Sequence, residues 1–113
     1  MNKEELDKEW NRIIKKVSED FGMEADMQGV LFLIGVQELG QGFRKFKKDE
    51  KLEVMHIAIC TLLSRYGYYE YEGHDSEGWP HFKFNEELPP LKPAQQHTLM
   101  RDAIIEYFKE GDY

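Results

Sequence analysis

Side chains that could do chemistry are concentrated between Tyr68 and Phe84, in the sequence YYEYEGHDSEGWPHFKF. Histidines and carboxylates bind divalent metal ions, and tyrosine or tryptophan rings stack on sugars, on bases or on a partner protein. We therefore predict that a ligand or a protein partner binds to this segment. The candidate binding residues are Tyr69, Tyr71, His74, Asp75, Trp79 and His81.

The histidines and acids of this segment follow the pattern H-D-x-E-x-x-x-H, from His74 to His81. This spacing matches no established set of metal ligands. Asp75 and Gly78 also favour turns, which explains their presence without a ligand. The sequence therefore predicts no catalytic residue, no metal ion and no cofactor here. The alternative is a metal ion held by the two histidines that flank the turn.

His56 and Cys60 lie one helical turn apart, in the apolar run VMHIAIC. This is not a known spacing of a catalytic cysteine and histidine, and we expect His56 to be a neutral residue of the core. Two of the carboxylates of this segment could form an acid–base pair only at a suitable separation, which a sequence does not show. The candidates are Glu70, Glu72, Asp75 and Glu77. No phosphate-binding glycine loop, zinc-finger spacing or nucleophile elbow is present. We therefore expect no catalytic activity, with an enzyme as the alternative.

Alternating hydrophobicity on both sides of HDSEG predicts a β-hairpin at about residues 68–84. Tyr69 and Tyr71 alternate with glutamates, and Phe82 and Phe84 alternate with polar residues. Successive side chains of a strand point to opposite faces, so we expect only half of the aromatic residues of this region to face the core, while the rest face out or meet another chain. These residues are Tyr66, Tyr68, Tyr69, Tyr71, Trp79, Phe82 and Phe84. The alternative is that the rings only pack the hairpin onto the helices.

The charges of the two predicted strands are complementary. Glu70 or Glu72 opposite Lys83 would form a favourable cross-strand pair. The competing interpretation extends the third helix through Glu72 and leaves the following loop irregular.

Four helices are predicted from an apolar repeat of about 3.6 residues and from helix-end signals. Asn2 and Glu5 form a capping box, and Gly22 ends the first helix. The middles of the second and third helices, VLFLIGV and VMHIAICTLL, are apolar on nearly every side and should be buried all round. Gly29 and Gly35 in the second helix predict a close approach by another backbone. The expected helices lie between Asn2 and Gly22, from about Ala25 to Leu39, from about Glu50 (with Asp49 as N-cap) to Tyr66, and from Pro93 to near Gly111.

These elements predict a mainly α fold class. We expect one small four-helix bundle-like domain over residues 1–113, with the β-hairpin of about residues 68–84 inserted between the third and fourth helices. Two centrally apolar helices are a large surface for so short a chain to bury. We therefore expect a homodimer in which part of the second helix is buried.

The composition opposes partners that are themselves negatively charged. The chain has 22 acidic and 15 basic residues and a formal net charge of −7, so nucleic acid and anionic membranes are repelled. The basic segment from Arg44 to Lys51, with Phe43 and Phe46 interleaved, could nevertheless contact phosphates or bases. The acidic hairpin and the apolar third helix argue against recognition of bases.

Location is predicted from what the chain lacks. Its one cysteine, Cys60, allows no internal disulfide, as is usual in a reducing compartment. The N-terminal segment has no apolar core of a signal peptide, and the longest apolar run, Val30 to Val36, is too short to cross a bilayer. We expect a cytoplasmic protein that does not enter the membrane.

Abundant apolar and aromatic surface without a catalytic constellation predicts a small protein-interaction or regulatory module that self-associates. The first alternative is a ligand- or metal-binding domain, with or without enzymatic activity, that uses residues 68–84. The second is a nucleic-acid-associated protein that uses residues 44–51.

Overall fold

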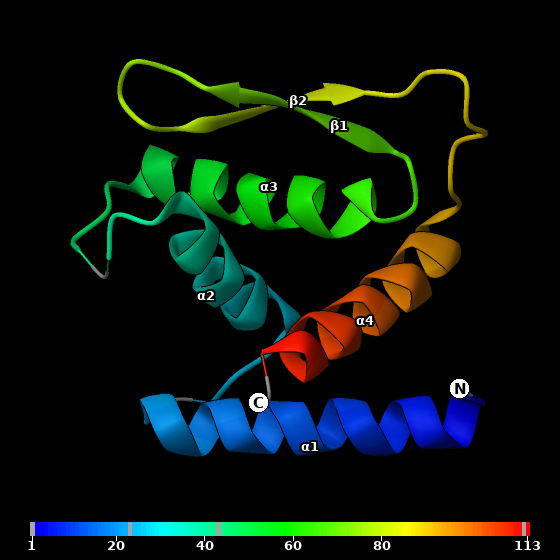
Figure 1. Ribbon diagram of the computed structural model, residues 1–113. Helices are drawn as coiled ribbons and strands as arrows, with labels where there is room; N and C mark the ends of the chain where they lie inside the picture. The colour runs from blue at the N-terminus through cyan, green and yellow to red at the C-terminus, as the bar shows by residue number, and fades with distance from the viewer. Residues whose placement is uncertain (1, 23, 43, 112) are drawn as a thin grey trace. The chain divides into compact units, whose positions relative to one another are not determined.

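The structure, a computed structural model, describes residues 2–22, 24–42, 44–111 and 113. Over these residues, four helices and one antiparallel two-stranded hairpin follow one another, with the hairpin between the third and fourth helices (Figure 1). This order confirms the predicted mainly α fold class and the position of the hairpin. The elements are α1 (Lys3–Phe21), α2 (Met27–Leu39), α3 (Lys48–Ser64), β1 (Tyr69–His74), β2 (Pro80–Phe84) and α4 (Pro93–Glu110).

The chain divides into two compact units. One comprises the residues up to Val30 together with those from Pro90 onward, and the other comprises Leu31–Pro89. Among the described residues, no helix is both long and apolar enough to traverse a lipid bilayer. The single-domain organisation expected from the sequence stays a prediction.

The first unit is built by α1 and α4, which pack against each other. The predicted ends of α1 are confirmed, since the Asn2 side chain accepts the Glu5 N–H at 2.8 Å and Gly22 has a left-handed φ of 62°. Asp7 and Arg101 form an ion pair of 3.2 Å between the two helices. The buried side chains of this unit include Ile13, Val17, Met100, Ala103, Ile104 and Ile105.

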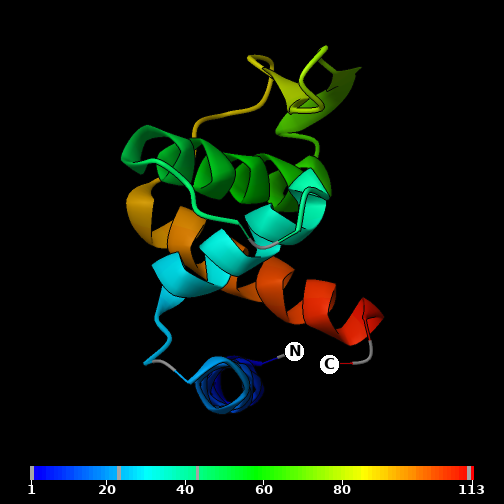
Figure 2. The same ribbon diagram turned by 90° about the vertical axis from the view of Figure 1, so that its left-hand side faces the viewer.

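The second unit contains the predicted binding segment. In Figures 1 and 2, α3 lies between the hairpin on one side and α2 on the other. An apolar cluster forms where α2 and α3 meet, and Trp79 from the end of the hairpin packs against it together with Phe32. This contact ties the hairpin to the core of its unit. The cluster consists of Val36, Leu39, Phe46, Val54 and Ile57.

The start of α3 differs from the expected one. The helix begins at Lys48 with Lys47 as N-cap, so Asp49 lies in the first turn and is not the cap. The reason is that the Glu50 carboxylate accepts the N–H of Lys47 at 2.9 Å, which fixes the start of the helix two residues earlier. The helix ends at Ser64, also two residues earlier than expected, ahead of a tight turn that leads to Gly67 with φ 84°.

The start of α2 also differs. The helix begins at Met27 and not at Ala25, because the Asp26 side chain accepts the N–H of Gly29 at 2.8 Å, as an N-cap residue does. The predicted end of the helix at Leu39 is confirmed, and Gly40 and Gly42, which follow it, each have a left-handed φ of 74°.

The hairpin is confirmed, and a third helix extended through Glu72 is excluded. Tyr69 pairs with Phe84 and Glu70 with Lys83, so the expected charge pair is formed across the strands. The register shifts after Tyr71, where an irregularity lies before Gly73. Such a bulge changes which side chains share a face of the sheet.

Gly35 confirms the predicted close approach of two backbones. It lies in the middle of α2, where a β-carbon would overlap the carbonyl oxygen of Val54 and would lie 2.7 Å from Val54 Cγ1. Because a backbone atom cannot turn aside as a side chain can, α2 and α3 can meet here only if residue 35 has no side chain.

We predict that Gly35→Ala lowers the free energy of unfolding by about 1–3 kcal/mol, because overpacking outweighs the better helix propensity of alanine. Chemical denaturation followed by circular dichroism measures this change. The control is Gln37→Ala, an exposed site on the same helix, which should stay within about 0.5 kcal/mol of the parent chain. A Gly35→Ala chain as stable as the control would show that the two backbones do not need this approach.

Candidate functional site

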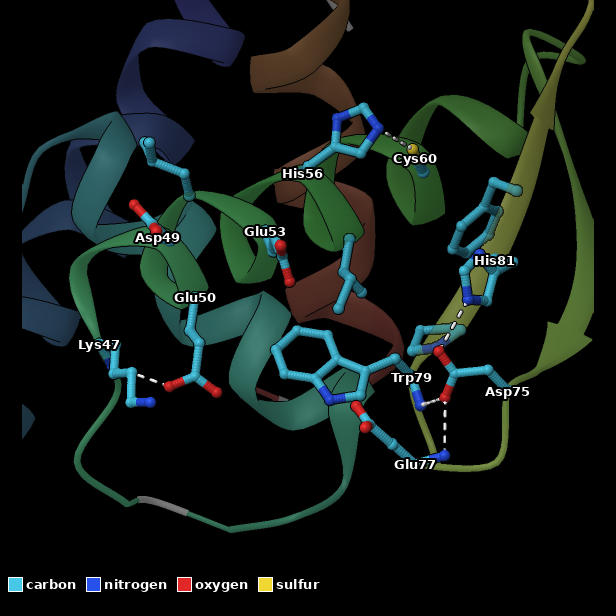
Figure 3. A pocket seen from close by; sticks show the side chains of 14 residues that line it. Lys47, Asp49, Glu50, Glu53, His56, Cys60, Asp75, Glu77, Trp79 and His81 are labelled. Atoms are coloured by element: carbon cyan, nitrogen blue, oxygen red, sulfur yellow. Dashed lines mark hydrogen bonds and ion pairs between the residues drawn. The ribbon is translucent and has the colours of Figure 1, made fainter.

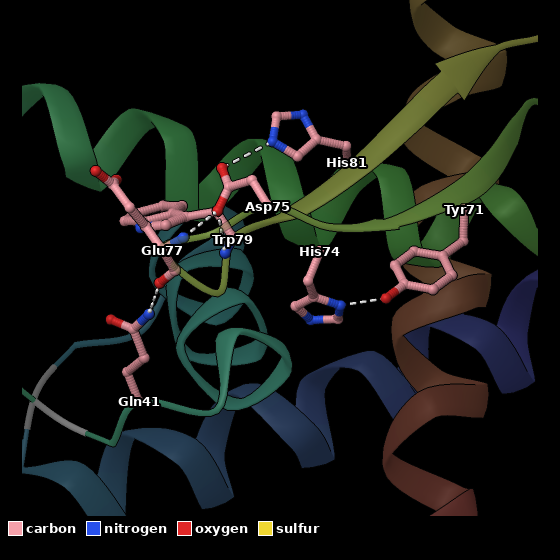
Figure 4. Close-up of polar contacts among 7 residues, drawn as sticks. All are labelled: Gln41, Tyr71, His74, Asp75, Glu77, Trp79 and His81. Carbon is pink, nitrogen blue, oxygen red and sulfur yellow. Dashed lines mark hydrogen bonds and ion pairs between the residues drawn. The ribbon is translucent and has the colours of Figure 1, made fainter.

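Asp75 organises the end of the hairpin. Its Oδ1 accepts the backbone N–H groups of Glu77 at 2.9 Å and of Trp79 at 3.0 Å. Its backbone N–H donates to the Trp79 carbonyl at 2.9 Å, and Gly78, with φ 86°, completes the turn. The turn chemistry expected of Asp75 and Gly78 is thus present in the structure, and it places Trp79 against the core of the unit (Figure 4).

The second oxygen of Asp75 faces His81. The Oδ2 atom lies 2.9 Å from His81 Nε2. This hydrogen bond, followed by the one from the Trp79 N–H, lowers the pKa of the Asp75 carboxyl group below its ordinary value of 3.8. Both oxygens are therefore engaged within the hairpin, and Asp75 has a structural role that is complete without a ligand.

His74 and His81 do not meet. His74 pairs with Pro80 across the strands and its Nδ1 contacts the Tyr71 hydroxyl, whereas His81 turns to Asp75 (Figure 4). The bulge between Tyr71 and Gly73 is the reason, because it places His74 on the face of Tyr71. Within the described part of the chain, no three histidine, cysteine or acidic side chains come together in a way that could hold a metal ion.

Five rings lie on one face of the hairpin, the face that is turned toward α3, and we call this the aromatic face: Tyr69, Tyr71, His74, Phe82 and Phe84. The ring centroids of Tyr69 and Phe84 are 5.4 Å apart, and those of Tyr71 and Phe82 are 5.7 Å apart. Tyr69 packs against α3, where its ring meets that of His56 edge to face with 6.2 Å between the ring centroids. Burial raises the pKa of the Tyr69 hydroxyl above its ordinary value. Tyr71 and Phe84 nevertheless remain 51% and 49% exposed.

A groove of about 800 Å³ lies between the N-terminal half of α3 and the end of the hairpin (Figure 3). From α3 it is lined by Asp49, Glu50, Leu52, Glu53, His56 and Cys60. From the hairpin it is lined by Asp75, Glu77, Trp79, Pro80, His81 and Phe82. Three of the six candidate residues, Asp75, Trp79 and His81, therefore line one concave surface, while Tyr69, Tyr71 and His74 belong to the aromatic face.

His56 is exposed on α3, so its expected place in the core is wrong. The helix turns this position toward the groove, and His56 Nε2 lies 3.3 Å from Cys60 Sγ (Figure 3). Cys60 itself is a buried free thiol, and burial raises its pKa to about 11. A nucleophilic cysteine needs a lowered pKa, so this pair lacks the electrostatics of a catalytic one.

Some side chains of the basic segment, Arg44 to Lys51, are engaged in contacts within the unit. The Arg44 guanidinium forms an ion pair with Glu50 at 3.2 Å and lies over the ring of Phe46, 4.2 Å from its centroid. Phe46 is buried in the core cluster and presents no free face for a base. Phe43, the other aromatic residue of this hypothesis, lies outside the described residues.

Sequence reasoning missed the wall that α3 contributes to the groove. Leu52 is 65% exposed and lies just before the apolar middle of the helix, for which burial on nearly all sides was expected. The available signal was its setting in KDEKLE, where one apolar residue stands among charges. A solvated first turn of the helix follows from that pattern.

No family model matches the sequence, and comparison with curated proteins and with solved structures found no significant match. The groove and the aromatic face are therefore the features on which an inference of function rests.

We predict that the Asp75 carboxylate titrates below pH 3.8 and that the turn loosens with it. Because the pKa of Asp75 is lower in the folded chain than in the unfolded chain, the ionised carboxylate stabilises the fold at pH values above 3.8. This stabilisation is lost as the pH falls through the lowered pKa of the folded chain. NMR titration of the Glu77 and Trp79 amide signals measures it. In Asp75→Asn, which keeps the accepting Oδ1, this transition should vanish.

Glu72→Gln, an exposed carboxylate of the same hairpin, is the control and should leave the transition in place. A midpoint at or above 3.8, or a transition that survives in Asp75→Asn, would assign the titration to another group.

We predict that Cys60 in the folded chain reacts with iodoacetamide at neutral to mildly alkaline pH about 100-fold more slowly than an ordinary thiol, since a pKa near 11 leaves little thiolate. His56→Ala should not change the rate, because burial sets this pKa. Mass spectrometry follows the reaction, and the denatured chain gives the reference rate. Equal rates in the folded and denatured chains would restore the cysteine as a candidate nucleophile.

Proposed function

We propose that this chain is a small cytoplasmic protein-interaction module that self-associates and has no catalytic activity of its own, and that two copies meet through the part of the aromatic face that α3 leaves exposed. The observation that carries the proposal is the half-exposed state of Tyr71 and Phe84 on a row of packed rings. Large aromatic side chains held rigidly at a surface are typical anchors of protein interfaces.

The second helix, where a dimer contact was expected, has less exposed apolar surface for such a contact. Among the described residues, the exposed large apolar side chains include Leu52, Tyr71 and Phe84, and none of the exposed ones belongs to α2. The hairpin is therefore a better supported surface for self-association than the second helix.

Charge favours a second copy as the occupant of this face. The chain carries a net charge of −7, so two copies repel each other in general. The aromatic face, however, contains no acidic or basic side chain apart from His74, while Glu70 and Lys83 point to the opposite face of the strands. Since α3 covers part of this face, two copies would meet at its exposed rings, Tyr71 and Phe84, and bury ring against ring there. Glu38 lies beside Tyr71, and Glu86 and Glu87 lie beside Phe84, so the contact is restricted to the rings themselves.

The absence of activity and the cytoplasmic location are supported by the same residue. Cys60 is a free thiol and its raised pKa opposes nucleophilic chemistry. A lone free cysteine is also usual in a reducing compartment.

We predict that the parent chain dimerises with rising concentration and that Tyr71→Thr with Phe84→Thr makes it monomeric. Threonine keeps the β propensity of both strands while it removes the rings. Size-exclusion chromatography with light scattering, and sedimentation at several concentrations, measure the mass.

The matched control is Glu70→Thr with Lys83→Thr, a cross-strand pair of the same hairpin on its other face, which should still dimerise. The proposal is overturned by a parent chain that stays monomeric at the highest concentration, or by a ring-free variant that dimerises as well as the parent.

A further inference from the structure

We propose that the groove between α3 and the end of the hairpin binds a basic peptide segment of a partner protein, with one large apolar side chain of that segment in the groove and its flanking lysines or arginines on the acidic rim. This inference rests on the proposal of an interaction module. The groove adjoins the aromatic face, and Phe82 belongs to both.

The floor of the groove is apolar. Trp79, Ile57 and Phe82 line it, and Trp79 is held in place by the core cluster on one side and by the Asp75 turn on the other. Leu52 stands at the edge with 65% of its surface exposed. The volume of about 800 Å³ is within the range of pockets that enclose ligands, so it is ample for one large side chain and its neighbours. An apolar floor with a polar rim is the usual anatomy of a binding surface.

The rim is acidic and largely uncompensated. Five carboxylates and one lysine line the groove. Glu50 is paired with Arg44, and Asp75 with His81. The carboxylates of Asp49, Glu53 and Glu77 have no ion pair or hydrogen bond with any part of the chain that the structure describes, since Glu77 bonds to Gln41 and Asp75 only through its backbone. Figure 3 shows Glu53 and Glu77 on either side of the Trp79 indole in that view.

The negative charge of the rim favours a positively charged ligand. Uncompensated carboxylates around an apolar floor attract cations and repel acidic peptides, phosphates and nucleic acid. A bare metal ion is not favoured, because no three potential ligands converge among the described residues. An apolar side chain between basic residues satisfies both the floor and the rim.

The test uses fluorescence anisotropy with a labelled peptide in which a Leu–Trp pair is flanked on each side by two lysines or arginines. We expect the full chain to bind it at low ionic strength. A peptide with two serines in place of the Leu–Trp pair should bind more weakly, and a peptide with glutamates in place of its basic residues should not bind.

Three variants locate the site. Glu53→Gln with Glu77→Gln should weaken binding about 3- to 10-fold, because two exposed charges are lost. Leu52→Ser should weaken it about 5-fold, and its high exposure protects the fold. Glu19→Gln with Glu24→Gln, the same charge change at exposed sites outside the groove, should leave affinity within about 2-fold.

Several results would overturn the inference. It is contradicted if the basic peptide fails to bind, if the serine peptide binds equally well, or if both groove variants bind with unchanged affinity. Dissociation of a dimer by the peptide would also contradict it, because the groove would then bind a second copy. The ring-free variant separates the two proposals, since it should be monomeric and still bind the peptide. If the chain binds the peptide but never dimerises, only the proposal of self-association is overturned. If the chain dimerises but does not bind the peptide, only the proposal of peptide binding in the groove is overturned.

Discussion

The close approach of α2 and α3 at Gly35 is the constraint on which the second unit depends. Because no side chain separates the two backbones, the Val54 carbonyl sits against residue 35 and the apolar cluster of Val36, Leu39, Phe46, Val54 and Ile57 can form around the crossing. Trp79 packs on that cluster and brings the end of the hairpin beside α3. The Trp79 contact, together with that of Tyr69 with His56, holds the two walls of the groove side by side.

One carboxylate connects this packing to local backbone chemistry. Asp75 holds the turn through three partners and so presents Trp79 to the core, while the bulge before Gly73 turns His74 away from His81. Polar residues that resemble a metal site in the sequence are thereby divided between a turn and an aromatic row. The unit presents two surfaces of different chemistry, one of exposed rings and one with an apolar floor and an acidic rim.

Much of the fold follows from short-range rules. The Asn2 cap, the left-handed Gly22, the alternation around HDSEG and the pairing of Glu70 with Lys83 all depend on residues close in sequence or on strand periodicity, and all are present in the structure. Helix starts at Met27 and Lys48 differ by two residues from expectation, because side chains of Asp26 and Glu50 settle which N–H groups are satisfied. Several acceptable caps compete there, and the sequence does not rank them.

The sequence by itself determined the helices, the hairpin and the concentration of polar and aromatic residues near its turn. Only the tertiary structure decided which of these residues act together. Periodicity cannot show that α3 turns His56 toward the hairpin, because the apolar run around it has no polar face to mark its solvent side. The charges around Leu52 and Glu53 indicate a solvated turn, but they do not show that the hairpin lies opposite. Nor can spacing show that Asp75, Trp79 and His81 line a groove while His74 lies on the face of Tyr71, since one bulge reverses the faces of a strand.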